Sequence, residues 1–232
     1  MRNPYGKEIC DEIRQNVRDD LHRMLVQITN KEMQGWVVEA WATSLYLNGF
    51  SAIRELQGSG NIDNLVEKGA TQADHLCGVA DFAKSIGETL LRKNPDLDID
   101  IDTLIAGGLL HDLGKPIEYN IESRRKWLKE PHKEGNPTAT HAMYGYYICM
   151  LLELPTAICH IPANHCMEAS AVGVVRSIAC TIVNHADYLY WDCLRIMGLL
   201  DPEYPYSRPR WEPYQYRTDP TKNYFKQIID GM

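Results

Sequence analysis

The chain lacks the features that tie a protein to a membrane or to a nucleic acid. Its apolar runs stop well short of the roughly 20 residues that a membrane-spanning helix needs, and no charged-then-apolar leader opens it. The 24 lysines and arginines are outnumbered by 31 aspartates and glutamates, so the net charge is −7 and no global basic field exists. We therefore expect no membrane association and no nucleic-acid polymer as a partner.

The cysteines lack the spacing of a zinc knuckle. There are seven, an odd number, and no two of them form a Cys-x-x-Cys pair. Most lie beside apolar residues, which predicts buried, reduced thiols and a cytoplasmic location.

What the sequence does have is helical periodicity along most of its length, with no internal repeat. Apolar residues recur at helical spacing, so we expect helices over 5–28, 31–50, 62–68, 71–94, 98–110, 141–154, a short stretch from Pro155, and from Gly173 to about Leu200. Gly49 is a plausible stop for the second of these, and Thr71 with Asp74 forms an approximate capping box. Alternating aspartate and isoleucine at 98–102 is compatible with a strand, but we favour an acidic helix entry.

These patterns predict an all-α fold with one domain over residues 1–200. Residues 1–69 would form an N-terminal helical extension and residues 70–200 the core. The turn-rich segment 116–140 is expected to be a long loop, with one helical turn at 122–129. Residues 201–232, rich in proline and tyrosine, predict an extended arm on this subunit or on a neighbour, and the second case would make a homo-oligomer.

Potential metal ligands lie near the ends of several predicted helices, and one lies midway along the last. They are His75, His111, Asp112, His141, His165 and Asp187. A mid-helix aspartate in apolar surroundings needs a partner, because an unpaired buried carboxylate is costly, and a metal ion would supply one.

Imidazole and carboxylate ligands together suit a divalent transition metal, so we expect iron, manganese, nickel, cobalt or zinc as cofactor, with one or two ions bound. Four ligands can hold one ion, and the two further histidines could hold a second, with one carboxylate bridging. Two ions about 3.5–4 Å apart can activate a water and neutralise a departing oxygen in phosphoryl transfer.

Three other histidines compete less well for these roles. His160 lies five residues before His165 and is an alternative to it. His185 precedes Asp187 by two residues and therefore faces away from it on a helix. His22 is expected to have no role in the site.

Lys115 follows Asp112 by three residues, past a turn at Gly114, and would point its ammonium toward the open side of a bound metal. We therefore assign it, with Asp112, a catalytic role, and a role in binding a small anionic substrate. The other candidate substrate-binding residues are polar side chains of the following loop and one later arginine: Glu118, Arg124, His132, Lys133 and Arg176.

The ordered set His75, His111-Asp112 and Asp187 resembles the HD superfamily of metal-dependent phosphohydrolases. The segments "QADHLCGVADFA", "AGGLLHDLGKP" and "NHADYLYWD" look like the usual surroundings of that family's ligands, over about residues 70–200. The resemblance implies an HD-type helical bundle and hydrolysis of a small phosphate ester or nucleotide through metal-activated water.

His141 and His165, 24 residues apart, resemble the intervening histidines of dinuclear branches of that superfamily. These branches include cyclic dinucleotide phosphodiesterases and mixed-valent diiron oxygenases similar to myo-inositol oxygenase. The chain has "NHCME" and no GYP, unlike the cyclic-di-GMP branch, and "HDLGK" also occurs in the oxygenases. A phosphohydrolase or phosphodiesterase is the favoured reading, a diiron oxygenase the second, and a non-catalytic regulatory module the third.

Overall fold

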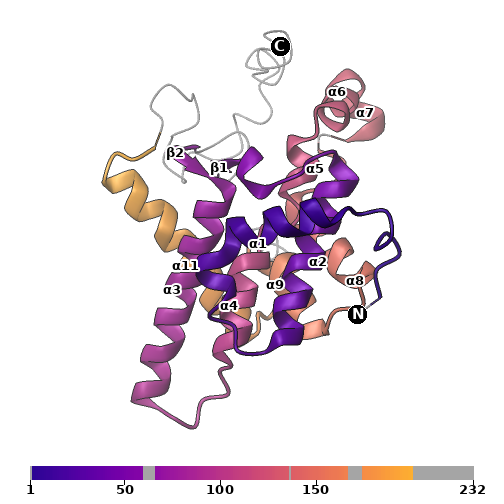
Figure 1. Ribbon diagram of the computed structural model, residues 1–232. Coiled ribbons are helices and arrows are strands. Elements are labelled where there is room, and N and C mark those ends of the chain that lie inside the picture. The colour runs from indigo at the N-terminus through magenta and orange to yellow at the C-terminus, as the bar shows by residue number, and fades with distance from the viewer. Residues whose placement is uncertain (1, 60–65, 136, 167–173, 201–232) are drawn as a thin grey trace.

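The structure, a computed structural model, describes residues 2–59, 66–135, 137–166 and 174–200, and these residues are mostly helical (Figure 1). The elements, in chain order, are α1 (Asp11–Leu25), α2 (Lys31–Asn48), a 3-10 turn η1 (Ile53–Glu55), β1 (Gln57–Ser59), β2 (Val66–Thr71), α3 (Gln72–Lys93), α4 (Ile101–Leu110), α5 (Lys115–Tyr119), α6 (Ile121–Lys129), α7 (Pro131–Glu134), α8 (His141–Leu151), α9 (Thr156–Asn164) and α11 (Ile178–Ile196). The predicted all-α class is confirmed, with one small antiparallel pair of strands added to it.

Helices α3 and α4 pack against each other at the centre of the bundle. On one side they meet α1 and α2, and on the other they meet α11, so the helices of the N-terminal extension and of the core share one interior (Figure 1). One cluster of buried apolar side chains joins α1, α2, α3, α4, α8 and α9, and a second joins α3, α4, α9 and α11. Burial of these faces is the main stabilising contribution to the fold.

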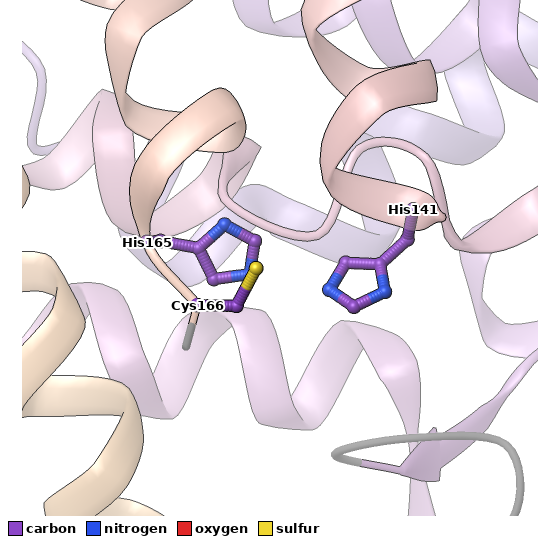
Figure 2. A group of neighbouring side chains, drawn as sticks. All are labelled: His141, His165 and Cys166. Atoms are coloured by element: carbon purple, nitrogen blue, oxygen red, sulfur yellow. The ribbon is translucent and has the colours of Figure 1, made fainter. Parts of the chain in front are cut away.

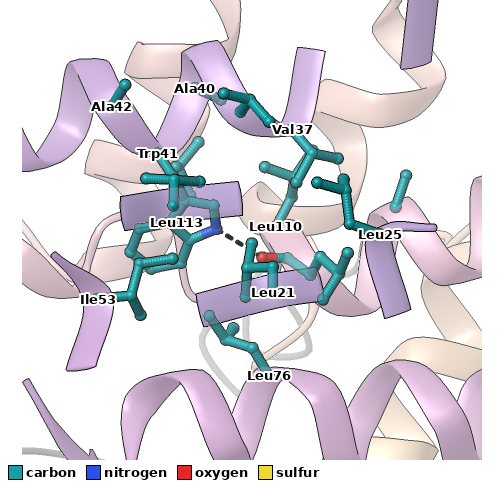
Figure 3. Close-up of a cluster of buried hydrophobic side chains, with 14 of the residues drawn as sticks. Leu21, Leu25, Val37, Ala40, Trp41, Ala42, Ile53, Leu76, Leu110 and Leu113 are labelled. Atoms are coloured by element: carbon teal, nitrogen blue, oxygen red, sulfur yellow. Dashed lines mark hydrogen bonds between the residues drawn. The ribbon is translucent and has the colours of Figure 1, made fainter. Parts of the chain in front are cut away.

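Trp41 of α2 lies in the middle of the larger cluster, among side chains that include Leu21 of α1 and Leu76 of α3 (Figure 3). Its indole Nε1 donates a hydrogen bond to the main-chain oxygen of Leu109, 2.7 Å away near the end of α4. Ser44, one turn further along α2, donates to the oxygen of Leu113 at 2.7 Å. Helix α2 therefore satisfies two buried carbonyls on either side of the 111–112 pair.

Several helix ends follow from local sequence as expected. Gly49 ends α2 in the left-handed conformation, with φ of 78°, which glycine adopts without steric cost. Thr71 and Asp74 form the capping box of α3. The acidic entry at 98–102 is helical, because the Asp100 carboxylate accepts hydrogen bonds from the backbone N–H groups of Asp102 and Thr103 and so caps α4.

Two expectations about local structure were wrong. Most of 116–140 is not a loop but three short helices, of which α6 contains the helical turn expected at 122–129. Pro116 and Pro131 stand in the first turns of α5 and α7, and Asn120 caps α6. The predicted helix at 62–68 is wrong for residues 66–68, which pair in β2, and residues 62–65 lie outside the described part of the chain. The predicted arm at 201–232 also lies outside the described residues.

No helix among the described residues combines the length and the apolar character that crossing a membrane requires.

Asp102, in the first turn of α4, anchors the connection between α1 and α2. Its carboxylate accepts hydrogen bonds from Thr29 N at 2.9 Å, Thr29 Oγ1 at 2.7 Å and Asn30 N at 2.8 Å. Burial alone would raise the pKa of this carboxyl, but the three donors lower it below the ordinary value. The ionised form is therefore the one that the folded state favours.

We expect Asp102→Asn to destabilise the fold by about 1–3 kcal/mol at pH 7, because an amide cannot accept all three hydrogen bonds. The folded-state pKa lies below the ordinary 3.8, so the carboxylate's contribution is present above pH 3.8 and is lost as pH falls through the folded-state value. Urea denaturation across this pH range measures the difference, which should shrink in acid. Asp98→Asn, at an exposed carboxylate of the same segment, is the control; equal stability of Asp102→Asn and the unaltered protein at pH 7 would refute the assignment.

Candidate metal centre

The candidate ligands come from five helices whose ends or middles meet at one place in the bundle. His75 lies in the first turn of α3, and His111 and Asp112 follow the last turn of α4. His141 begins α8, His165 follows α9, and Asp187 lies midway along α11. All six are buried except Asp187, which is half-buried. The structure thus brings together all six residues that the sequence predicted as ligands.

The first cluster surrounds one oxygen of Asp112. The Nε2 atoms of His75 and His111 lie 3.1 Å apart, and they lie 3.4 and 3.6 Å from Asp112 Oδ2. Asp187 Oδ1 completes the group at 3.5 Å from His75 Nε2 and 3.8 Å from His111 Nε2. Two imidazoles and two carboxylates therefore direct one atom each at a common point.

The second cluster surrounds the other oxygen of the same carboxylate. Asp112 Oδ1 lies 3.4 Å from His141 Nε2 and 3.6 Å from His165 Nε2. One carboxylate thus faces two pairs of histidines, one pair with each oxygen.

The donor set fits divalent transition-metal ions by its chemistry. Asp187 Oδ1 is buried and has no hydrogen-bond partner among the described residues, and it faces imidazole nitrogens, which a metal ion would join to it. Burial lowers the pKa of His111 to about 4, so this imidazole is neutral at pH 7, the form that binds a metal.

Three of the four imidazoles are oriented by contacts at Nδ1. His111 Nδ1 lies 2.7 Å from the oxygen of Gly108, and His165 Nδ1 lies 3.0 Å from the oxygen of Pro162. His141 Nδ1 lies 2.9 Å from Glu118 Oε1. A proton on each Nδ1 leaves Nε2 as the lone-pair donor that faces the centre.

His75 is held by ring packing instead. Its ring centroid lies 4.7 Å from that of Trp191 and 5.1 Å from that of Tyr190, both on α11. These aromatic side chains fix the plane of the imidazole and cover it from solvent.

Gln72 is a functional candidate that sequence reasoning missed. Its Nε2 donates to Asp112 Oδ2 at 2.8 Å, and the side chain is fully buried. Its position one turn before His75 on α3 was the available signal, since residues three apart on a helix share a face. Gln72 therefore fixes the orientation of the shared carboxylate.

A buried chain of charges leads away from Asp112. Lys115 is fully buried, and its Nζ lies 3.6 Å from Glu118 Oε2. Burial alone would lower the pKa of Lys115, but Asp112 and Glu118 raise it above the ordinary value. Burial would raise the pKa of Glu118, but His141 and Lys115 lower it to about 2. Burial would also raise the pKa of Asp112, yet Lys115 and His111 hold it well below its ordinary value.

The predicted substrate-binding residues lie in three different settings. On α5, Lys115 and Glu118 are buried close to the candidate ligands, and Glu118 contacts one of them, His141. Arg124 is buried on α6. His132 and Lys133 are exposed on α7, where Lys133 Nζ lies 2.5 Å from Glu130 Oε1. Arg176 donates to main-chain oxygens of Asn164 at 2.5 Å and Cys166 at 2.8 Å, so it holds the end of α9. Whether each of them contacts substrate stays a prediction.

The structure separates His165 from its alternative. His160 Nε2 accepts a hydrogen bond from the N–H of Ser177 at 3.2 Å, and its Nδ1 lies 3.1 Å from Asn164 Nδ2. Both of its ring nitrogens are therefore engaged away from Asp112. His22 and His185 are exposed, as expected of histidines outside the site.

Comparison with known proteins places the whole ligand set inside one family match. The family model described as HD domain matches residues 73–192, just over half of the 232-residue chain. No curated protein and no solved structure matches this chain.

Proposed function

The chain belongs to the HD-domain family, and we propose that it hydrolyses a phosphoester bond of a small anionic substrate with the help of divalent transition-metal ions. The family as a whole is one of metal-dependent phosphohydrolases. The observation that supports the proposal best is the shared carboxylate, because Asp112 presents one oxygen to His75 and His111 and the other to His141 and His165.

His75, His111, Asp187 and one oxygen of Asp112 would hold one ion, and His141, His165 and the other oxygen of Asp112 would hold a second. When bound, such a pair of ions supplies an activated water and neutralises charge on phosphoryl oxygens. In this proposal the substrate is a small anionic phosphate ester, such as a nucleotide.

Lys115 contributes a fixed positive charge beside the shared carboxylate. Its raised pKa keeps the ammonium protonated at neutral pH, and its burial means that water screens this charge little. A permanent cation at this position favours negative charge on a substrate that approaches Asp112. Lys115 is therefore suited to stabilise negative charge on the substrate. It is not suited to act as a general base, because its raised pKa keeps it protonated.

Glu118 positions His141 in this proposal. One oxygen, Oε1, lies 2.8 Å from the backbone nitrogen and 2.9 Å from Nδ1 of that histidine. The carboxylate thereby fixes the ring and makes Nε2 more electron-rich. Its other oxygen faces Lys115, so the orientation of a ligand and the position of the cation depend on the same side chain.

The test is a panel of phosphomonoesters, phosphodiesters and nucleotides, offered to protein reconstituted with manganese, cobalt, nickel, iron or zinc. We expect metal-dependent release of phosphate or nucleotide from at least one ester, which a chelator stops. Asp187→Asn should lower turnover by roughly 100-fold or more, equivalent to about 2.7 kcal/mol of transition-state stabilisation. His185→Ala, at an exposed histidine of the same helix, should retain activity. Protein that binds metal but cleaves no ester in the panel would exclude the proposed function.

The same six residues also fit a diiron oxygenase, because both clusters share one carboxylate. Consumption of dioxygen by the iron-loaded protein with a hydroxylated substrate, and no ester cleavage, would favour this second candidate. Ester cleavage that proceeds without dioxygen would favour the hydrolase.

A further inference from the structure

Cys166, directly after the ligand His165, lies against the second cluster. One ligand atom each from His141, His165 and Cys166 lie within 4.8 Å of one another. Figure 2 shows the Cys166 sulfur beside the His165 ring, on the side that faces His141. The side chain is half-buried and is a reduced thiol. No other cysteine among the described residues joins such a group.

The end of α9 explains how two consecutive side chains can face one centre. Within an α-helix, consecutive residues point about 100° apart, as 3.6 residues per turn require. Helix α9 ends at Asn164, and His165 is its cap, so Cys166 lies outside the helix. Arg176 fixes this exit by donating to the main-chain oxygens of Asn164 and Cys166. The backbone is therefore held in the conformation that directs both side chains to the second cluster.

The two clusters differ in their negative charge. The first contains the Asp187 carboxylate as well as one oxygen of Asp112, whereas the second contains two imidazoles and only the other oxygen of Asp112. A divalent cation in the second cluster would have the Asp112 carboxylate as its one negatively charged ligand, and it would share that carboxylate with the first cluster. A thiolate would supply the additional charge and a fourth ligand atom, which completes a tetrahedral set.

We propose that the Cys166 thiolate is a ligand of the second metal ion, together with His141, His165 and Asp112. The inference rests on the proposed metal centre, and it is independent of which bond the centre cleaves. Binding forms one sulfur–metal bond, breaks the S–H bond, and releases the proton to solvent.

Thiolate ligation makes the two positions chemically unequal. A soft sulfur ligand favours zinc, cobalt or ferrous iron over magnesium, calcium or manganese, so the second position selects its metal more strictly than the first. The first position, with nitrogen and oxygen ligands only, keeps its remaining coordination sites for water and substrate. In this arrangement the second ion also protects the thiol from reagents that reach a half-buried side chain.

The test is a titration of the metal-depleted, full-length protein with Co²⁺, followed by absorption spectroscopy. Visible d–d bands report binding of the ion, and near-ultraviolet sulfur-to-cobalt charge-transfer absorption reports a thiolate ligand. We expect the charge-transfer absorption to appear with one of two bound equivalents. Cys166→Ser should abolish this absorption and lower the affinity for that Co²⁺ ion by about 10–100-fold or more. Loss of a side chain that only hydrogen-bonds a metal ligand already lowers metal affinity by this factor.

Cys193→Ser, at another half-buried cysteine, is the matched control and should retain both the absorption and the affinity. Mass spectrometry after iodoacetamide treatment gives a second measurement on the unaltered protein, in which Co²⁺ should protect Cys166 from alkylation. Two bound equivalents without charge-transfer absorption would overturn the proposal, as would a single bound equivalent or retention of the absorption in Cys166→Ser. Failure of the ester panel with a retained charge-transfer band would instead refute the hydrolase function and leave the ligand assignment intact.

Discussion

Asp112→Ala should remove both metal ions and lower phosphoester turnover by at least about 1,000-fold, equivalent to about 4 kcal/mol. The reason is that the two oxygens of this one carboxylate face the two pairs of histidines at 3.4–3.6 Å. No second carboxylate among the described residues faces both pairs. Metal analysis by mass spectrometry after reconstitution, together with turnover of the best ester, measures the effect.

Two further variants make this result interpretable. Asp112→Asn keeps the volume of the side chain but removes its charge, and should lose the ions while the circular dichroism of the helices is unchanged. Asp192→Ala, at a more exposed carboxylate on α11 that pairs with Arg195, should keep two ions. An Asp112→Ala protein that still binds two ions would refute the shared-carboxylate centre.

Gly114→Ala should destabilise the fold by at least about 3 kcal/mol, a value at the upper end for overpacked sites. A Cβ atom at this position would lie 1.9 Å from the oxygen of His141 and 2.7 Å from the nitrogen of Gly145. Both neighbours are backbone atoms of α8, which cannot rotate away as a side chain can. Relief of the clash has to move the first turn of α8, and His141 with it.

Urea denaturation measures the stability loss, and the metal content of the folded fraction should show weaker binding of the second ion. Gly35→Ala in α2 is the matched control, since a Cβ there meets no atom within 4 Å. That change should raise stability by about 0.5–1 kcal/mol through helix propensity. Equal stability of Gly114→Ala and the unaltered protein would contradict the close contact between Gly114 and the backbone of α8.

Three of the candidate ligands carry a physical signal along the chain, whereas His75, His141 and His165 were candidates only through their places near predicted helix ends and in the ordered set. Asp187 interrupts an apolar helical stripe, and His111 and Asp112 end one, so both placements call for a compensating partner. The helices that present them were predictable from periodicity and caps, as Thr71 and Gly49 illustrate.

The contacts between elements were not predictable in this way. The contact between Glu118 and His141, 23 residues apart along the chain, has no signal in the sequence, because only the packing of α5 on α8 brings the two residues together. Gln72 has no sequence feature that indicates Asp112 as its partner. The sequence did not distinguish Cys166 from the other cysteines, because its place beside His141 and His165 depends on where α9 ends.

Local misreadings had a similar origin. Prolines 116 and 131 suggest a loop by composition, yet in the first turn of a helix proline lacks only an N–H that would have no partner. Strand β1 contains no apolar residue, and β2 contains two charged residues and a glycine without regular alternation, so the local sequence does not predict either strand.

Trp41 and Ser44 of α2 donate hydrogen bonds to the carbonyls of Leu109 and Leu113, and these contacts bear on which residues a stable fragment must include. The family match starts at residue 73, so both donors lie outside it, although they hydrogen-bond the backbone on either side of His111 and Asp112, the candidate metal-binding pair. A fragment that contains only the matched residues would lack both hydrogen-bond donors, and it would expose the apolar side chains that α1 and α2 cover. The match therefore leaves out the first two helices, although their side chains form part of the same hydrophobic core and donate hydrogen bonds to the backbone on both sides of His111 and Asp112.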